Sequence, residues 1–483
     1  MPPSPPDPSS MHHAAGWHHK HPAAHAEKVS AWTKSAYGLG GLTDFFYLNM
    51  VNALAVPIFA IALKMDPLWV AVALAIPKVV GAITDPIAGS LSDNARTRWG
   101  RRRPFILGGG LVGVVLLPLI WMPPFDSQGG MFAWLALLLA IFAAAYSVFA
   151  VPYGALGFQL STDYDERTRV LAWKGYIQTA GTFTAAWFYW FCLQPAFGSE
   201  VVGVRWLSLI VSAAMLVGIV ATVFACPEKV DATAAQPRIP LGPALRLTLK
   251  NRPYLLLQGT ILIIALGTGC EGLIGSYVHI YYTCQGDKTL ASLITGLGGT
   301  LTVFATFAAL PLGLWLSTHL GKRTSALIGL AFALGGILLL PFTLVPQSPY
   351  LIIVSWIIIA LGMPWASLMF GSMTADITDE DELATGMRRE GMYVAVGGFL
   401  GKIVSVITLL LGGWLPHLAN YTDPGVPPNE GELTLMRTML IGIQAFAVIA
   451  AVIILRLYPI TRARSEETRR LLDLRKTAAP QGE

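Results

Sequence analysis

Charged residues are scarce in this sequence. Asp, Glu, Lys and Arg make up 13% of its 483 residues, whereas hydrophobic residues make up 54%. Soluble domains contain about 25% charged residues, so the composition excludes a soluble multidomain protein. The apolar residues form runs of about 20, long enough to cross a bilayer as helices, and short polar or Gly/Pro-rich segments separate them. We therefore predict an all-α polytopic membrane protein with about 12 transmembrane helices.

Cysteine is also rare. The four cysteines fall in or beside apolar runs, show no CxxC spacing and have no histidine pairs near them. We therefore expect no metal site. The first 27 residues lack the apolar core of a signal peptide and carry six of the nine histidines. The irregular spacing of these histidines favours a disordered His/Pro-rich tail over a metal-binding segment.

Lys and Arg are distributed unevenly between the two predicted sides of the membrane. One side has the loop 96–103, the linker 227–252 and the C-terminal tail, whereas the opposite connections have only Lys64, Arg205, Lys288 and Arg437. By the positive-inside rule, we expect the side rich in Lys and Arg, and both termini, to face the cytoplasm; the expected location is a cell inner membrane. This bias accounts for the net charge of +5, so we expect a lipid bilayer and no nucleic acid as partner.

Two segments of the chain recur. Residues 152–156 (PYGAL) are echoed by 364–368 (PWASL), and residues 89–93 followed by Gly-Arg-Arg are echoed by 313–317 followed by Gly-Lys-Arg. The repetition predicts two pseudo-symmetric six-helix bundles. Their expected bounds are 35–226 and 253–458, with a cytoplasmic tail at 1–34, a linker at 227–252 and a basic tail at 459–483. Parallel repeats around a central site are typical of secondary carriers.

Asp85 lies in an otherwise apolar stretch, 82–89 (AITDPIAG). A carboxylate near the bilayer centre costs roughly 2.5 to 3.5 kcal/mol, so such residues usually face a cavity and serve function. The alternative is an acid near a helix end that reaches water. We interpret Asp85 as a candidate ionisable coupling site.

Two long motifs surround this residue and its counterpart in the second half. Residues 84–107 (TDPIAGSLSDNARTRWGRRRPFIL) and 375–391 (ADITDEDELATGMRREG), with Lys402 beyond them, resemble the glycoside/pentoside/hexuronide:cation symporter family of the major facilitator superfamily. The similarity covers about residues 35 to 460. The resemblance implies the major facilitator fold and cation-coupled symport of a sugar or glycoside by alternating access.

The resemblance also implies a cation site. In that family the Asp of the Asp-Pro motif binds the coupling ion, which corresponds to Asp85, with Thr84 and Ser147 as neighbouring ligands. Lys402 and Lys78 are the candidate charge partners of Asp85, although Lys78 is also able to reach water from a helix end. The melibiose-type carrier has a second acid where this chain has Gly81, which favours H+ over Na+ as coupling ion and leaves Na+ open.

Sugar recognition of the melibiose type is absent, because Ala150 and Gly154 occupy the positions of its Asp and Trp. Other residues are able to bind sugar hydroxyls or stack on a sugar ring. Each aromatic among them has packing as its alternative role. The predicted substrate-binding residues are Asp44, Asn52, Tyr146, Lys174, Glu271, Tyr277, Trp365 and Tyr393.

A cytoplasmic gate is the last predicted site. The family's gating motif corresponds to Asp93 with Arg101 or Arg102, and positive-inside charge alone is the alternative reading. The acidic stretches of both halves are expected to form inter-bundle salt bridges in the outward-facing state. Their representatives are Asp163, Arg167, Asp376 and Arg388.

We therefore expect a monomeric carrier without cofactor other than the coupling ion, and no enzymatic activity. One alternative is a carrier of the same architecture for a non-sugar solute such as a lysolipid. A non-transporting solute sensor is a more remote alternative.

Overall fold

The computed structural model describes residues 28–161, 163–228, 248, 250–386 and 389–478. Within these residues the regular elements are helices, without a strand. The tail before residue 28, most of the linker and Arg388 lie outside the described residues, and so do the predictions made for them. Helix α1 begins at Ala31, four residues before the predicted boundary at residue 35.

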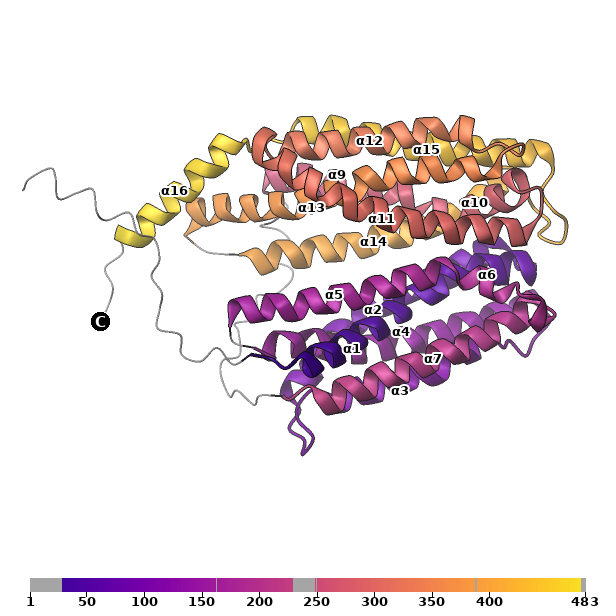
Figure 1. Ribbon diagram of the computed structural model, residues 1–483, viewed down its shortest axis with the longest axis horizontal. Coiled ribbons are helices and arrows are strands. Elements are labelled where there is room, and N and C mark those ends of the chain that lie inside the picture. Colours follow the sequence, from indigo (N-terminus) through magenta and orange to yellow (C-terminus); the bar gives the residue numbers. More distant parts are fainter. Residues whose placement is uncertain (1–27, 162, 229–247, 249, 387–388, 479–483) are drawn as a thin grey trace, which may run out of the picture.

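The helices form two bundles that lie side by side (Figure 1). The N-terminal half consists of α1 Ala31–Ala55, α2 Pro67–Asn94, α3 Arg103–Ile120, α4 Gln128–Gln159, α5 Tyr164–Ala186, α6 Phe188–Cys192 and α7 Glu200–Ala225. The C-terminal half consists of α9 Arg252–Gly269, α10 Glu271–Tyr277, α11 Lys288–Leu320, α12 Lys322–Thr343, α13 Ile352–Thr385, α14 Glu390–Leu418 and α15 Glu430–Arg456. This arrangement confirms the predicted all-α polytopic architecture.

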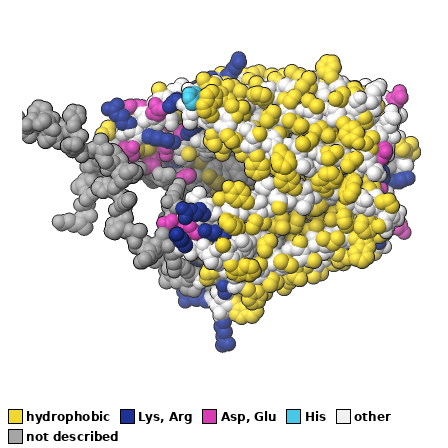
Figure 2. Space-filling view, in the orientation of Figure 1, with side chains coloured by type: hydrophobic (Ala, Val, Ile, Leu, Met, Phe, Trp, Pro, Cys, Tyr) yellow, Lys and Arg dark blue, Asp and Glu magenta, His cyan; other side chains and the backbone are white. Residues whose placement is uncertain are grey.

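Eleven helices in the described part of the chain are long and apolar enough to cross a membrane. Helix α5 is not among them, although it packs along α1 and continues through α6. Its polar residues, Lys174 and Gln178 among them, turn toward the interior and contact Asp44. Such polar residues lower the mean hydropathy of the helix, so a criterion based on apolar composition misses it. Figure 2 shows the broad hydrophobic belt of the molecule, with charged side chains gathered at its two ends.

Local sequence explains where many helices begin. Asp66, Asp163, Asp287 and five Ser or Asn residues place a side-chain oxygen on a free N–H of the first turn. The first membrane span of each half also ends alike: α1 continues into a π-helical turn at Val56–Ala62, and α9 with α10 continues into one at Val278–Thr283. This echo supports the pseudo-symmetry of the halves.

The core of the N-terminal half is aromatic. Tyr37, Tyr153, Phe149 and Tyr47 stack in succession, with ring centroids 4.7, 5.4 and 5.7 Å apart. The Tyr47 hydroxyl donates to the Gly109 carbonyl over 2.7 Å. These contacts join α1 to α3 and α4, so the polar side chains of α1 and α4 are presented to one central space.

The two ends of the bundles differ in what they carry. The terminal end holds Val29, Glu228 and a further helix, α16 Arg462–Ala478, which lies in the predicted basic tail and packs on α13. The opposite end, called the far end below, holds Asp66, Glu200 and His417. Figure 1 shows α16 extending beyond the bundles at the terminal end.

Candidate functional site

Asp85 lies at the centre of a polar cluster on α2 and α4. The Ser147 hydroxyl donates to Asp85 Oδ1 over 2.5 Å, and the Thr84 hydroxyl lies 2.6 Å from Ser147 Oγ. Pro86 follows directly and lacks the N–H that would bond to the Ala82 carbonyl, which loosens the helix at this point. The structure thus brings the three predicted cation-site residues together.

Lys402 joins this cluster from the other half. Its Nζ lies 2.6 Å from Asp85 Oδ2, and the two side chains are 36% and 35% exposed, so water and ions reach the pair. Lys78 lines the central cavity that is described below. Among the described residues, the structure shows no ion pair for it. Of the two lysines predicted as partners of Asp85, the one in contact is Lys402, 317 residues away in the chain.

A second charged cluster surrounds Asp44 on α1. Asp44 Oδ2 lies 3.3 Å from Lys174 Nζ, and Asp44 Oδ1 accepts a hydrogen bond from the Tyr146 hydroxyl over 2.9 Å. Gln178 donates to Asp44 over 3.3 Å and was missed by sequence reasoning. Its position four residues after Lys174 on one helix was the available signal, because such residues share a face. Lys174 Nζ also lies 4.8 Å from the centroid of the Tyr153 ring.

A cavity of about 410 Å³ lies between the two halves and is lined mostly by apolar residues. Its polar lining includes Asn52, Lys78, Asp85, Tyr146 and Lys402. Tyr47 and Ser405 also line it and were not predicted. Small-molecule sites have this size and composition, with a few polar groups that orient the ligand in an apolar space.

Six of the eight predicted substrate residues do not line this cavity. Asp44 and Lys174 belong to the cluster described above, and the other four lie in the C-terminal half. Tyr277, Trp365 and Tyr393 are only 1%, 1% and 2% exposed, because they pack inside the C-terminal half. Trp365 donates to the Ser325 hydroxyl over 2.9 Å, and the Tyr393 hydroxyl accepts from Asn251 over 2.9 Å. Glu271 lines a separate pocket within the C-terminal half. For the three aromatics, the structure shows the packing role.

The predicted gate residues lie at the terminal end. Arg102 approaches Asp93 to 3.7 Å, while the backbone N–H groups of Arg101 and Arg102 donate to Glu228, which sequence reasoning missed. Asp163 caps α5 by accepting from the Glu166 N–H over 2.8 Å.

The remaining gate residues also contact their own half. Arg167 donates to the Ser161 carbonyl over 3.4 Å. Asp376 is 5% exposed and lies 2.6 Å from Lys322 and 3.2 Å from Arg469. The inter-bundle pairing expected for Asp376 is thus not the pairing of this structure.

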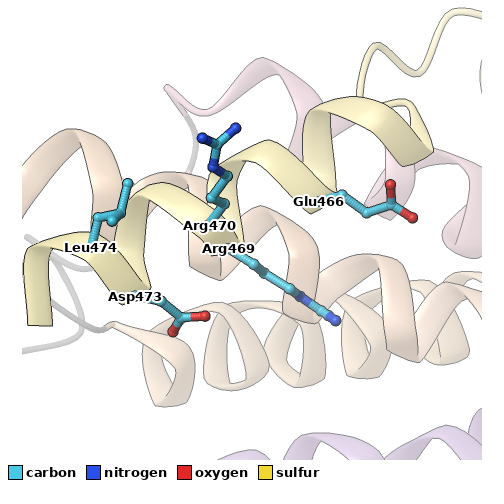
Figure 3. Close-up of a pocket in the computed structure, with 5 residues that line it drawn as sticks. All are labelled: Glu466, Arg469, Arg470, Asp473 and Leu474. Carbon is cyan, nitrogen blue, oxygen red and sulfur yellow. The ribbon is translucent and has the colours of Figure 1, made fainter. Parts of the chain in front are cut away.

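Other parts of the described chain offer less chemistry. An open hollow of about 480 Å³ is lined only by α16 residues, namely Glu466, Arg469, Arg470, Asp473 and Leu474 (Figure 3). This hollow contains no residue of the clusters around Asp85 and Asp44, called the two charged clusters below. Within the described residues, no group of three or more His, Cys, Asp or Glu side chains is placed to hold a metal ion.

Two helical bundles around a central cavity, with an ion pair between the halves, are the architecture of a secondary transporter of the major facilitator superfamily. The family model described as "MFS/sugar transport protein" matches residues 31–462. The chain belongs to this family, and its relatives support the glycoside:cation symporter family indicated by the two motifs. It is therefore a multi-pass membrane transport protein for a small molecule.

Individual relatives match nearly the whole chain, but at low sequence identity. The chain is 24% identical to "Glucuronide carrier protein homolog" of Escherichia coli, over 94% of this chain and 98% of the relative. It is 26% identical to "Sodium-dependent lysophosphatidylcholine symporter 1-A" of Danio rerio, over 92% and 89%. Among solved structures, the nucleoside transporter NupG has a TM-score of 0.64 at 13% identity, covering 89% of this chain and 100% of that chain.

Proposed function

We propose that this protein is a cation-coupled symporter of a sugar or glycoside that works by alternating access, with H+ favoured over Na+ as coupling ion. The observation that carries the proposal is the ion pair between Asp85 of α2 and Lys402 of α14, at 2.6 Å across the central cavity. One partner belongs to each half, so any ion that neutralises Asp85 also weakens a link between the halves.

Coupling follows from this position. When H+ binds Asp85, the carboxylate loses its charge and the attraction to Lys402 falls. The loaded carrier then differs from the empty one in its preference for the two access states, and a ligand shifts such an equilibrium only through differential affinity. The proposed order is cation first, sugar second, and movement of the loaded complex past the pair formed by Asp93 and the arginines at 101 and 102.

The oxygen count near Asp85 supports H+. Ser147 and Thr84 supply one hydroxyl each, while Lys402 already occupies Oδ2 and Gly81 brings no second acid. A proton needs only one accessible carboxylate, whereas a metal cation requires several oxygen ligands at once. Backbone carbonyls near Pro86 are able to supply further oxygen ligands for Na+, so the test also includes a Na+ gradient.

The sugar is assigned to the space between the two charged clusters. Asp44 and Lys174, with Gln178 and Tyr146, combine acceptors and donors within reach of vicinal hydroxyls. Asn52 adds an amide to the cavity wall. We further propose a monomer in a cell inner membrane with its terminal end in the cytoplasm. The Lys and Arg bias supports this orientation.

A lysolipid carrier is the second candidate. The observation that favours it is the similarity to a relative named as a sodium-dependent lysophosphatidylcholine symporter. Against it stand the two charged clusters at the centre of the molecule, since an acyl chain requires a continuous apolar path. Both ligand classes belong in the same assay.

The test is uptake into proteoliposomes of labelled glycosides, pentosides, uronides and lysophosphatidylcholine, under separate H+ and Na+ gradients. The variants are Asp85→Asn and, as matched control, Asp126→Asn, because Asp126 is exposed in the loop after α3. We expect Asp85→Asn to lower gradient-driven accumulation roughly 5- to 150-fold, the usual span of coupling between two ligands. Asp126→Asn is expected to match the wild type.

Exchange without a gradient separates coupling from binding. We expect Asp85→Asn to retain exchange of labelled for unlabelled sugar, because the Asp44 cluster is untouched. Accumulation that is undiminished in Asp85→Asn contradicts the proposed coupling site. Uptake of lysophosphatidylcholine with no uptake of any sugar contradicts the sugar assignment and selects the second candidate.

A further inference from the structure

A second pocket lies inside the C-terminal half, apart from the central cavity. Its volume is about 380 Å³. Most of its walls come from α10, α11, α12, α13 and α15, with Thr268 from α9 and His279 from the π-helical turn Val278–Thr283. It shares no lining residue with the central cavity. Figure 1 shows these five helices within the same bundle. The pocket is therefore a feature of one half, independent of the contacts between halves.

Glu271 is the acidic residue of this pocket, and no Lys or Arg lines it. Among the described residues the structure shows no ion pair or hydrogen bond for the Glu271 side chain. Other carboxylates at the ends of the bundles are paired: Glu200 with Lys288 and Asp376 with Lys322, each at 2.6 Å. Glu271 is exposed to its pocket. A carboxylate within a membrane-spanning bundle usually faces a water-filled cavity and pairs with another polar group, so an unpaired one marks a candidate binding site.

Three hydroxyl groups that line the pocket already donate their hydrogens to backbone carbonyls, so toward a ligand they are acceptors. Thr268 donates its hydrogen to the Ile264 carbonyl over 2.9 Å, Thr295 to the Ala291 carbonyl over 2.9 Å, and Ser276 to the Gly272 carbonyl over 3.2 Å. A hydroxyl has one hydrogen and two lone pairs, so each of the three Oγ atoms has lone pairs left for a ligand.

His279 adds another acceptor. Its Nε2 lies 3.0 Å from the Ala291 carbonyl, which only accepts, so Nε2 carries a hydrogen. In the neutral ring Nδ1 then offers a lone pair. Nδ1 is buried without a partner, and the whole side chain is 8% exposed. An unpartnered acceptor in the wall of a pocket that also holds an unpaired carboxylate calls for a ligand with positive charge and hydrogens to donate.

We propose that this pocket binds a hydrated monovalent cation, with Glu271 as its counter-charge. Glu271 and His279 are eight residues apart, about 12 Å along a helix, so both cannot touch one bare ion. A water occupies about 30 Å³, so the pocket has room for an ion with its water shell. The shell donates hydrogens to the Thr, Ser and His acceptors. The cation is either an alkali ion or hydronium, which have this chemistry in common.

The site goes beyond the proposed symport, because it requires neither Asp85 nor a sugar. It is tested by the melting temperature of the purified full-length protein in NaCl, KCl, LiCl and choline chloride at equal ionic strength, repeated from mildly acidic to mildly alkaline pH. A ligand that binds only the folded protein raises its melting temperature as its concentration rises. The variants are Glu271→Gln, Asp85→Asn and, as a matched surface control, Glu430→Gln.

For an alkali ion, we expect one salt to raise the melting temperature of the wild type, Asp85→Asn and Glu430→Gln, and to lose this effect in Glu271→Gln. For hydronium, the salts act alike, and the pH dependence seen in Asp85→Asn is reduced in Glu271→Gln. Glu271→Asp retains a carboxylate and keeps the response, which covers the case in which Glu271→Gln does not fold.

Three results overturn the proposal. One is a Glu271→Gln protein whose salt and pH responses equal those of the wild type. Another is a response that Asp85→Asn abolishes and Glu271→Gln retains, which assigns the ion to the central cavity. The third is a wild type that responds to neither salt nor pH. Since no transported sugar is needed, failure of the symport proposal is distinguishable from each of these.

Discussion

The far end and the terminal end of the molecule are held together by different contacts. At the far end, side chains of one half bind the other: Lys288 Nζ lies 2.6 Å from Glu200 Oε1, and His417 Nε2 lies 3.2 Å from Asp66 Oδ2. At the terminal end, the ion pairs found among the described residues join residues of the same half. Examples are Glu166 with Lys34, Asp93 with Arg102, Asp376 with Lys322, and Asp381 with Arg389.

Helices of the two halves also approach each other closely toward the far end. Gly413 of α14 lies so close to α2 that an added Cβ would be 2.3 Å from the Ala71 Cβ. Gly299 of α11 faces Ala186 of α5, where an added Cβ would be 2.6 Å from the Ala186 Cβ. The far end is therefore closed by direct contact of helices from the two halves. If the terminal end is cytoplasmic, as proposed, this is an inward-facing state, and these contacts must break to reach the other state.

The largest expected effect comes from a wedge at the far end. In Gly413→Leu the new side chain overlaps Ala71 and the Pro67 carbonyl, so the far end cannot close. We expect uptake to fall roughly 5- to 150-fold, because an overpacking cost of about 1 to 3 kcal/mol acts on one access state only. Uptake into proteoliposomes measures this.

The control is Gly442→Leu, because an added Cβ at Gly442 meets nothing within 4 Å. Accessibility is read from Asn52→Cys in the central cavity, since the four native cysteines are buried. A membrane-impermeant thiol reagent on the far side should label it faster in the Gly413→Leu background. Equal labelling in both glycine variants would show that the far end does not control access.

A smaller effect is expected from the ion pair at the far end. Glu200→Lys and Lys288→Glu each place like charges opposite one another, whereas the double variant restores the attraction. Because the pair is partly exposed, we expect a coupling of about 1 kcal/mol, or roughly a fivefold change in the balance of access states. The same Asn52→Cys labelling assay measures it. Additive effects of the two substitutions would mean that the pair does not hold the halves together.

The smallest effect on transport is expected at the terminal end. Lys322→Met removes the 2.6 Å partner of Asp376 but leaves Arg469 and Ser465 in contact with it. We expect a lower melting temperature, with a cost below the roughly 3 to 5 kcal/mol of stripping a buried ion of its partner. Far-side labelling of Asn52→Cys should stay unchanged, because this pair lies within one half. A change in labelling without loss of stability would contradict the comparison between the ends.

Much of the fold was predictable from local patterns. Apolar runs, the recurrent PYGAL and PWASL segments, and the motif around Asp85 indicated the two bundles and the family, because bilayer thickness sets the length of each helix. Helix α5 does not meet a criterion of apolar composition for a membrane span, because polar residues such as Lys174 and Gln178 lie along it. The break at Trp187 between α5 and α6 was not predicted.

The site was only partly predictable. Asp85, Thr84 and Ser147 were grouped through the family resemblance, but the choice of Lys402 over Lys78 as ion partner depends on how α14 crosses α2. Gln178 and Glu228 were missed because each contacts its partners across more than a hundred residues of chain. Tyr277, Trp365 and Tyr393 looked like sugar platforms, yet their rings turn into the bundle.

The sequence by itself determined that this chain is a bundle of membrane helices in two related halves with a carboxylate at Asp85, because hydrophobic length and repetition are properties of the chain. Tertiary structure alone decided which charges meet, that Glu271 faces its own pocket, and that the far end is the closed one. Those outcomes depend on the rotation and crossing of helices far apart in sequence, which no local pattern encodes.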